Sequence, residues 1–330
     1  MQERTDGKNI RVNSLRTLLR IGGVLVILLF TALIVSALLG SERLAFFNLT
    51  EEQRAILFDI RLPRILLGAS VGASLAVAGA GLQPLLRNPL AEPYLLGVSN
   101  GAALGTMLAF VFLGQFEFSR PIMAFGGASL ATFTVYQMAK SRSGMNVERL
   151  VLSGVIVTTF LSSIMVLMTS LLDATKLRSF TFWLLGDLSQ ATIKGFYISL
   201  IVGIIGTVVM TSQAKALNLM MIGTRDAGDF GVEVTKVRLL VFGSASAMVG
   251  TAVAASGSVG YVGLIVPHLV RLAIGSDNRL VIPFSAIAGA IFVVLADTLA
   301  RIAISPRELP VGAITALIGA PLFIYLLKRN

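Results

Sequence analysis

Long apolar stretches recur along this sequence and are separated by short polar segments. A helix that crosses a lipid bilayer needs about 20 mainly apolar residues. The pattern predicts about ten such helices, two of them interrupted by glycine or proline. The expected spans are 21–40, 64–86, 94–114, 120–139, 149–172, 192–212, 237–256, 259–275, 281–304 and 310–327. The first span is longer than the roughly 7–15 apolar residues of a cleaved signal, so we expect it to be retained.

Composition supports a membrane protein. Hydrophobic residues make up 55% of the 330 residues and charged residues 13%, whereas a soluble domain carries about 25% charged residues. Much of the surface must therefore face lipid. We expect an all-α membrane protein with a cytoplasmic N-terminal segment, 1–20, and a single transmembrane domain, 21–330.

The distribution of basic residues predicts the orientation. The N-terminal segment is rich in Arg and Lys, and the segments expected on the same side, including 213–236, carry more Lys and Arg than Asp and Glu. The opposite segments are nearly balanced. Because cytoplasmic loops carry the excess of positive charge, both termini are expected inside, N-in and C-in.

Several kinds of chemistry lack the residues they need. The sequence contains no cysteine and one histidine, His268, which follows Pro267 at a probable helix kink. A metal site and a cysteine nucleophile are therefore not expected, and His268 is assigned a structural role. No Gly-x-x-x-x-Gly-Lys-Ser/Thr motif is present to hold ATP phosphates. We expect no catalytic residue, no metal and no cofactor, so an ATPase would be a separate chain.

Three arginines stand at the expected outer ends of spans, where the charge bias would not place them. Arg61 and Arg64 flank Pro63, and Arg301 follows Asp297 by four residues. Two interpretations remain open for the arginines. They could anchor to lipid phosphates, or they could form a docking patch for an acidic partner. Asp297 and Arg301 have the spacing of an ion pair on one helix face.

Four motifs carry a resemblance to a known family. They are RLPR at 61–64, GLQPLLRNPLAEPYLLGVSNGA at 81–102, GLIVPHLVRL at 263–272 and ELPVG at 308–312. Together they resemble the FecCD-type permeases, the membrane subunits of type II ABC importers for iron-siderophore complexes, haem and vitamin B12. The resemblance extends from about Asp59 to the C-terminus.

The resemblance implies the type II ABC importer permease fold in the inner (cytoplasmic) membrane. It implies ABC ATPase subunits, an external substrate-binding protein and a second permease subunit as partners, besides membrane lipid, and no nucleic acid. The expected substrate is an iron-siderophore complex, with cobalamin or haem as the other choices. The alternative function is an ion-coupled secondary transporter, which would want several ionisable groups within the membrane. An intramembrane enzyme is a third class. The sequence shows neither a nucleophile with a positioned base nor a set of metal ligands for it.

The resemblance also assigns roles to residues of this sequence. Binding-protein docking falls on Arg61, Arg64 and Arg301. A cytoplasmic gate is assigned to Asn146, Val147 and Glu148, although the family often has small hydroxyl residues there. ATPase coupling falls on the segment of about 213–236, in which Leu217 to Val234 should form two short helices. The coupling residues are Leu217, Met221, Gly223, Arg225, Asp226, Gly228 and Gly231.

Overall fold

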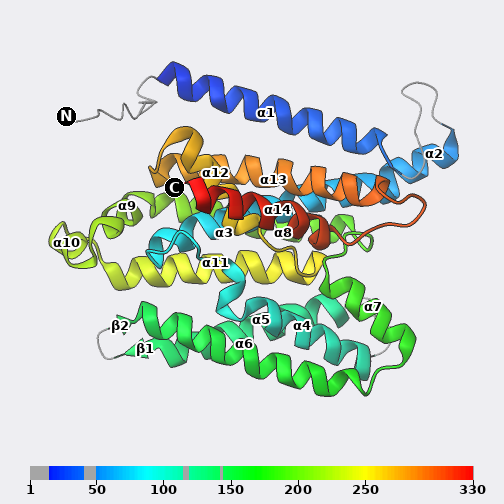
Figure 1. The fold of residues 1–330 in the computed structure, drawn as a ribbon, viewed down its shortest axis with the longest axis horizontal. Helices are drawn as coiled ribbons and strands as arrows, with labels where there is room; N and C mark the ends of the chain where they lie inside the picture. Colours follow the sequence, from blue (N-terminus) through cyan, green and yellow to red (C-terminus); the bar gives the residue numbers. More distant parts are fainter. Residues whose placement is uncertain (1–14, 41–49, 114–118, 142–143, 330) are drawn as a thin grey trace.

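The computed structural model describes residues 15–40, 50–113, 119–141 and 144–329. Most of the expected N-terminal segment, residues 1–14, lies outside the described residues. The described chain is a bundle of helices (Figure 1). The one pair of strands in this part of the chain is a two-residue antiparallel ladder, β1 (Lys140–Ser141) with β2 (Gly144–Met145).

The α-helices follow the expected spans, with short helices between some of them. In chain order they are α1 (Leu15–Leu38), α2 (Glu51–Ala55), α3 (Leu62–Leu85), α4 (Val98–Leu108), α5 (Ser119–Ala139), α6 (Val147–Thr169), α7 (Ala174–Leu184), α8 (Ile193–Ser212), α9 (Ala214–Ile222), α10 (Thr224–Asp229), α11 (Val234–Ser256), α12 (Val262–Ile274), α13 (Asn278–Ile302) and α14 (Val311–Arg329). Two π-helical turns, η1 (Ile56–Arg61) and η3 (Ala109–Leu113), and a 3₁₀ turn, η2 (Pro93–Leu96), adjoin α3 and α4.

Six helices in the described residues are long and apolar enough to cross a membrane. Three further apolar helices are shorter: Val98–Leu113, Val262–Ile274 and Val311–Leu326. The chain is thus an all-helical, multi-pass protein, and the total of ten spans stays a prediction. The start of α1 and the end of α14 lie at the same end of the bundle as α9 and α10, while α2 and α7 lie at the other end (Figure 1).

α3 is the central helix of the bundle. Most of its residues are buried, and it packs against α8, α11, α12 and α13. Glycines allow the backbones to touch: a Cβ on Gly72 would collide with the carbonyl oxygen of Gly289 in α13, and one on Gly79 with that of Gly263 in α12. The small residues of α3 therefore serve tight helix packing.

Two spans are broken within the bundle. α12 begins only at Val262, because the preceding residues turn through positive φ angles at Gly257 (66°) and Tyr261 (67°). The amide of Tyr261 donates a 2.8 Å hydrogen bond to the carboxylate of Glu92. The hydroxyl of Tyr94 pairs with the amide and carbonyl of Val259 at 3.0 and 2.9 Å. Backbone groups freed at this break are thus satisfied by Glu92, just before η2, and by Tyr94 within η2.

α1 lies along one side of the bundle, next to α13 (Figure 1). Only 11% of its apolar window is buried. Its packed residues include Ala32, which joins Ile65 and Val294 in a small cluster. Most of α1 therefore presents apolar side chains outward, as a lipid-facing helix does, and its attachment depends on few contacts.

The glycine contact between α3 and α13 gives a first prediction. Gly72→Ala should lower the free energy of unfolding by about 1–3 kcal/mol, because the added methyl group forces two backbones apart. The measurement is the apparent melting temperature of the purified chain in detergent.

Gly126→Ala in α5 is the matched control, since nothing lies within 4 Å of its added Cβ. It should be neutral or slightly stabilising, as helical Gly→Ala changes are in open space. Equal melting temperatures for the two variants would show that the α3–α13 approach is not tight.

Candidate functional site

Five charged residues, four of them buried and Glu308 exposed, form a group at the end of the bundle opposite α9 and α10, which we call the outer ion cluster. Its members are Arg61, Arg64, Asp297, Arg301 and Glu308. Arg61 and Arg64 lie at the start of α3, Asp297 and Arg301 in the last turns of α13, and Glu308 in the loop before α14. The cluster joins segments that are more than 200 residues apart in sequence.

Asp297 is the centre of this cluster. Its carboxylate accepts hydrogen bonds from Nε and Nη2 of Arg64, the latter at 2.9 Å, and from Nε of Arg301 at 3.1 Å. Nη1 of Arg64 donates to Glu308 at 2.6 Å. Arg64 therefore binds two carboxylates with its planar fork, a geometry that lysine could not supply.

The last turn of α1 compensates the remaining positive charge. Arg61 donates to the carbonyl of Ala37 at 3.0 Å, and Arg301 donates to the carbonyls of Leu39 and Ser36 at 3.0 and 3.1 Å. Carbonyl groups at a helix C-terminus carry partial negative charge and favour a cation there. The cluster thus anchors α1, a helix with little other packing, to the bundle.

The three arginines lie together at the end of the bundle opposite α9 and α10, and they are buried. They are 5% (Arg61), 6% (Arg64) and 3% (Arg301) exposed, and each donates to protein groups. The expected pair of Asp297 with Arg301 is confirmed. Docking by these arginines stays a prediction, and it has to account for their burial.

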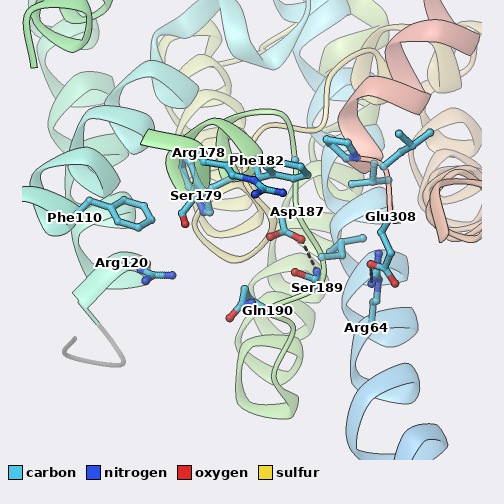
Figure 2. A pocket seen from close by; sticks show the side chains of 16 residues that line it. Arg64, Phe110, Arg120, Arg178, Ser179, Phe182, Asp187, Ser189, Gln190 and Glu308 are labelled. Carbon is cyan, nitrogen blue, oxygen red and sulfur yellow. Dashed lines mark hydrogen bonds and ion pairs between the residues drawn. The ribbon is translucent and has the colours of Figure 1, made fainter. Parts of the chain in front are cut away.

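A cavity of about 340 Å³ opens beside the cluster, and we call it the outer pocket. Arg64 and Glu308 lie on one side and Phe110 and Arg120 on the other, with Arg178 and Phe182 between them (Figure 2). The Arg120 guanidinium sits 4.4 Å from the centre of the Phe110 ring, and that of Arg178 lies 5.9 Å from the Phe182 ring. An arginine over an aromatic face keeps its N–H edge available to acceptors.

Three loops hold the wall of the outer pocket. The amide of Asp187 donates to the carbonyl of Ser256 at 2.8 Å, and the amide of Val311 donates to Gly186 at 3.0 Å. Gly186 has a φ of 86°, which a side chain would disfavour. The Asp187 carboxylate accepts from the amide of Ser189. Acidic and basic groups therefore face one pocket, which suits a polar partner rather than an apolar one.

α7 is a short helix that carries Trp183, at the same end of the bundle as α2 (Figure 1). Phe180 stacks on Trp183 and meets Phe110 edge to face. Asp173 caps the helix by accepting from the amide of Lys176 at 2.8 Å. That hydrogen bond holds the pKa of Asp173 below its usual value, so the cap stays charged at neutral pH.

The two short helices expected in the coupling segment are present as α9 and α10. Gly223 separates the two helices. Leu217 is buried, whereas Met221, Arg225, Asp226 and Gly228 are exposed. Gly231 has a φ of 80° and ends the segment.

The tip of this segment is apolar and exposed. Ile222 is 71% exposed and Phe230 is 75% exposed, with Met221 beside them in sequence. The tip projects beyond one end of the bundle (Figure 1). Exposed apolar side chains away from the lipid-facing sides of a membrane protein mark an interaction surface.

An asparagine that the sequence analysis missed ties α9 to α13. Nδ2 of Asn218 donates to Asp277 at 2.7 Å, and its Oδ1 accepts from the amide and Nδ2 of Asn278 at 2.9 and 2.7 Å. A hydrogen bond from Arg279 lowers the pKa of Asp277 to about 2. Asp277 therefore stays ionised over the whole physiological pH range. We call its contact with Asn218, together with the contact between Asn218 and Asn278, the α9–α13 joint.

The residues assigned to a gate lie at the start of α6. Asn146 caps that helix by accepting from the amide of Arg149 at 2.9 Å. Val147 and Glu148 occupy the first turn, and Glu148 is exposed. The geometry gives Asn146 a structural role at a helix end, and gating stays a prediction.

Comparisons with known proteins agree with this architecture. The model of the FecCD transport family matches residues 23–329. The chain belongs to the FecCD transport family. The cobalamin import system permease protein BtuC of Halobacterium salinarum is 42% identical over 285 residues, covering 86% of this chain and 76% of BtuC. The hemin transport system permease protein HmuU of Yersinia pestis is 36% identical and covers 93% of this chain and 95% of HmuU.

The solved structures lead to the same conclusion. A metal-chelate type ABC transporter, solved in an inward-facing conformation, superposes with a TM-score of 0.86 at 32% identity, covering 94% of this FecCD chain and 99% of that one. The family resemblance drawn from four motifs is therefore confirmed, and with it the fold. This FecCD protein is an integral, multi-pass membrane protein whose relatives are transport components.

The outer ion cluster generates a prediction about stability. Asp297→Ala should lower the free energy of unfolding by about 3–5 kcal/mol, because it leaves Arg64 and Arg301 buried without their shared carboxylate. The melting temperature in detergent would report the loss. Protease sensitivity of α1 should rise as well, since Arg301 helps to anchor it.

The control is an exposed ion pair on the same side of the bundle. Asp173 pairs with Lys176 at 3.6 Å in the open, and Asp173→Asn, which retains a capping side chain, should leave the melting temperature nearly unchanged. A similar small effect at Asp297 would mean that the buried cluster contributes little to stability.

Proposed function

We propose that this FecCD chain is the permease subunit of an ABC importer in the cytoplasmic membrane, driven by ATP hydrolysis on a separate chain. The observation that carries the proposal is the exposed apolar tip of α9 and α10, joined through Asn218 to the start of α13. Such a tip suits a partner that pushes on the bundle from one side. The import permeases among its relatives support the same assignment.

α13 offers a route from this tip to the opposite end of the bundle. Its first residues hold α9 through Asn278, and its last turns carry Asp297 and Arg301 of the outer ion cluster. It also packs against α3 along much of its length. We propose that displacement of α9 by an ATPase moves α13 as a rigid rod, so that both ends of the bundle respond together.

The partners follow from this arrangement. The ATPase subunits would bind α9 and α10 on the cytoplasmic side, which places both termini inside. A substrate-binding protein would dock at the opposite end, over the outer pocket and the three arginines. A second permease subunit would complete the translocation path, with Asn146, Val147 and Glu148 near its inner gate.

The substrate we propose is an iron-siderophore complex, with cobalamin or haem as the other candidates. Its relatives are named for cobalamin, hemin and iron(3+)-hydroxamate import. The helices that would line the path are rich in small and apolar side chains. The binding protein, rather than the path, would therefore select the substrate.

Two variants of the coupling segment test the proposal. Phe230→Asp places a charge in the apolar tip and should weaken association with the ATPase by about tenfold or more, because apolar contact area is lost. Association is measured by co-purification of the cognate ATPase with the full-length permease. Lys176→Gln, an exposed change on α7 at the opposite end of the bundle, is the control and should bind normally.

Asn218→Ala removes the hydrogen bonds between α9 and the start of α13 and leaves the exposed tip unchanged. It should leave the ATPase bound but reduce ATP-driven uptake into proteoliposomes by about tenfold, because α9 loses its hydrogen bonds to α13. Uptake that continues without the ATPase and collapses with an ion gradient would instead identify a secondary transporter.

A further inference from the structure

A second cavity, of about 470 Å³, lies at the end of the bundle that carries α9, and we call it the inner pocket. The end of α3, the proline-rich turn after it, the tip of α9 and the last turns of α12 enclose it. Its lining residues are Gln83, Pro84, Arg87, Asn88, Pro89, Met221, His268, Arg271, Leu272 and Ser276. Two arginines and the histidine thus face one cavity.

Among the described residues that line the inner pocket there is no aspartate or glutamate. The nearest acid in sequence, Asp277, is held by Arg279 at 2.9 Å and by Asn218 at 2.7 Å. The positive charges of Arg87 and Arg271 are therefore not neutralised within the lining. A cavity with this charge favours an anion.

The basic groups are held in place by the fold. The Arg271 guanidinium donates to the side-chain oxygen of Gln83 and to the carbonyl of Ala80, and Gln83 in turn donates to the carbonyls of Gly263 and Leu264. Arg87 is exposed and has a φ of 49°, a conformation uncommon for a residue with a side chain. A hydrogen-bonded framework thus presents Arg271, while the exposed Arg87 lines the same pocket.

His268 also lines the inner pocket, but its Nε2 atom is buried and has no hydrogen-bond partner among the described residues. The inner pocket does not expose this atom to a ligand, so the case for an anion rests on Arg87 and Arg271.

We propose that the inner pocket binds the phosphate group of an anionic phospholipid. Leu269 and Leu272 are exposed one helical turn apart on α12, so an apolar helix surface adjoins the basic groups and can take an acyl chain. Basic pockets between helices at the cytoplasmic surface are suited to anionic head groups. A free phosphate shares the head-group chemistry but would make no use of the leucines.

The test measures lipid retention by the full-length chain. The protein is exchanged into nanodiscs of mixed phosphatidylglycerol and phosphatidylcholine, released into detergent, and analysed by native mass spectrometry. The protein should retain phosphatidylglycerol in preference to phosphatidylcholine. Arg87→Asn should weaken its retention by about fivefold, since one cation near a head group is lost, and asparagine tolerates the positive φ at this position.

Lys215→Gln is the matched control, because it removes an exposed cation of α9 outside the pocket, and it should retain the lipid fully. As a second measurement on the unchanged protein, phosphatidylglycerol should raise the melting temperature where phosphatidylcholine and millimolar inorganic phosphate do not. This readout does not depend on how Arg87→Asn folds.

Four results would overturn the proposal. Three of them are equal retention of both lipids, equal loss in the two variants, and stabilisation by inorganic phosphate as strong as by the lipid. Weakened ATPase binding in Arg87→Asn, with no phosphatidylglycerol on the assembled complex, would assign the pocket to an acidic protein segment and equally exclude the lipid. Because no assay here requires transport, failure of the lipid site and failure of the proposed import function are distinguishable.

Discussion

The shared carboxylate of Asp297 is the interaction on which the outer half of this bundle depends. It binds two buried guanidinium groups that come from different helices, α3 and α13. Removing charges from water is costly, and only close, well-aligned partners offset that cost. Arg64 and Arg301 meet this condition through Asp297, Glu308 and the last carbonyls of α1. The position of three helices relative to one another is therefore fixed at a single point.

The tight glycine contacts extend this constraint along the membrane. Gly72 meets Gly289, and Gly79 meets Gly263, backbone against backbone. Packed helices with no room for a methyl group move as units rather than deform. At the far end of α13, Asn278 is bound to Asn218 of α9. A helix fixed at both ends and closely packed between them is a suitable element for transmitting force across a bilayer.

The sequence predicted the helices well because a hydrophobic run of the right length has few alternatives in lipid. It also predicted the pair of Asp297 with Arg301, since four residues along a helix bring side chains together. The contact of Arg64 with Asp297 joins residues 233 positions apart, and no local spacing encodes it. For the same reason the burial of the arginines was not foreseen.

Two local features also exceeded what a hydropathy pattern can show. The span expected at 259–275 begins as helix only at Val262, because Tyr261 adopts a left-handed conformation that Glu92 stabilises from another segment. The role of Asn218 likewise depends on neighbours near position 278. Asparagine in a short amphipathic helix carries no signal of its own, so only the tertiary structure could reveal the joint.

The burial of the outer ion cluster changes what docking would require. A partner cannot meet a free Arg64 or Arg301, because both arginines already bind protein groups. Glu308 differs from Asp297 in that its side chain is 37% exposed, against 3%. It also lies at the outer pocket beside Arg64 (Figure 2). Arg64 would keep its pair with Asp297 if Glu308 left. We infer that an acidic partner would replace Glu308 at Arg64 rather than add to the cluster. Such an exchange conserves charge while releasing the loop before α14, so docking would act on the bundle through the loop it frees.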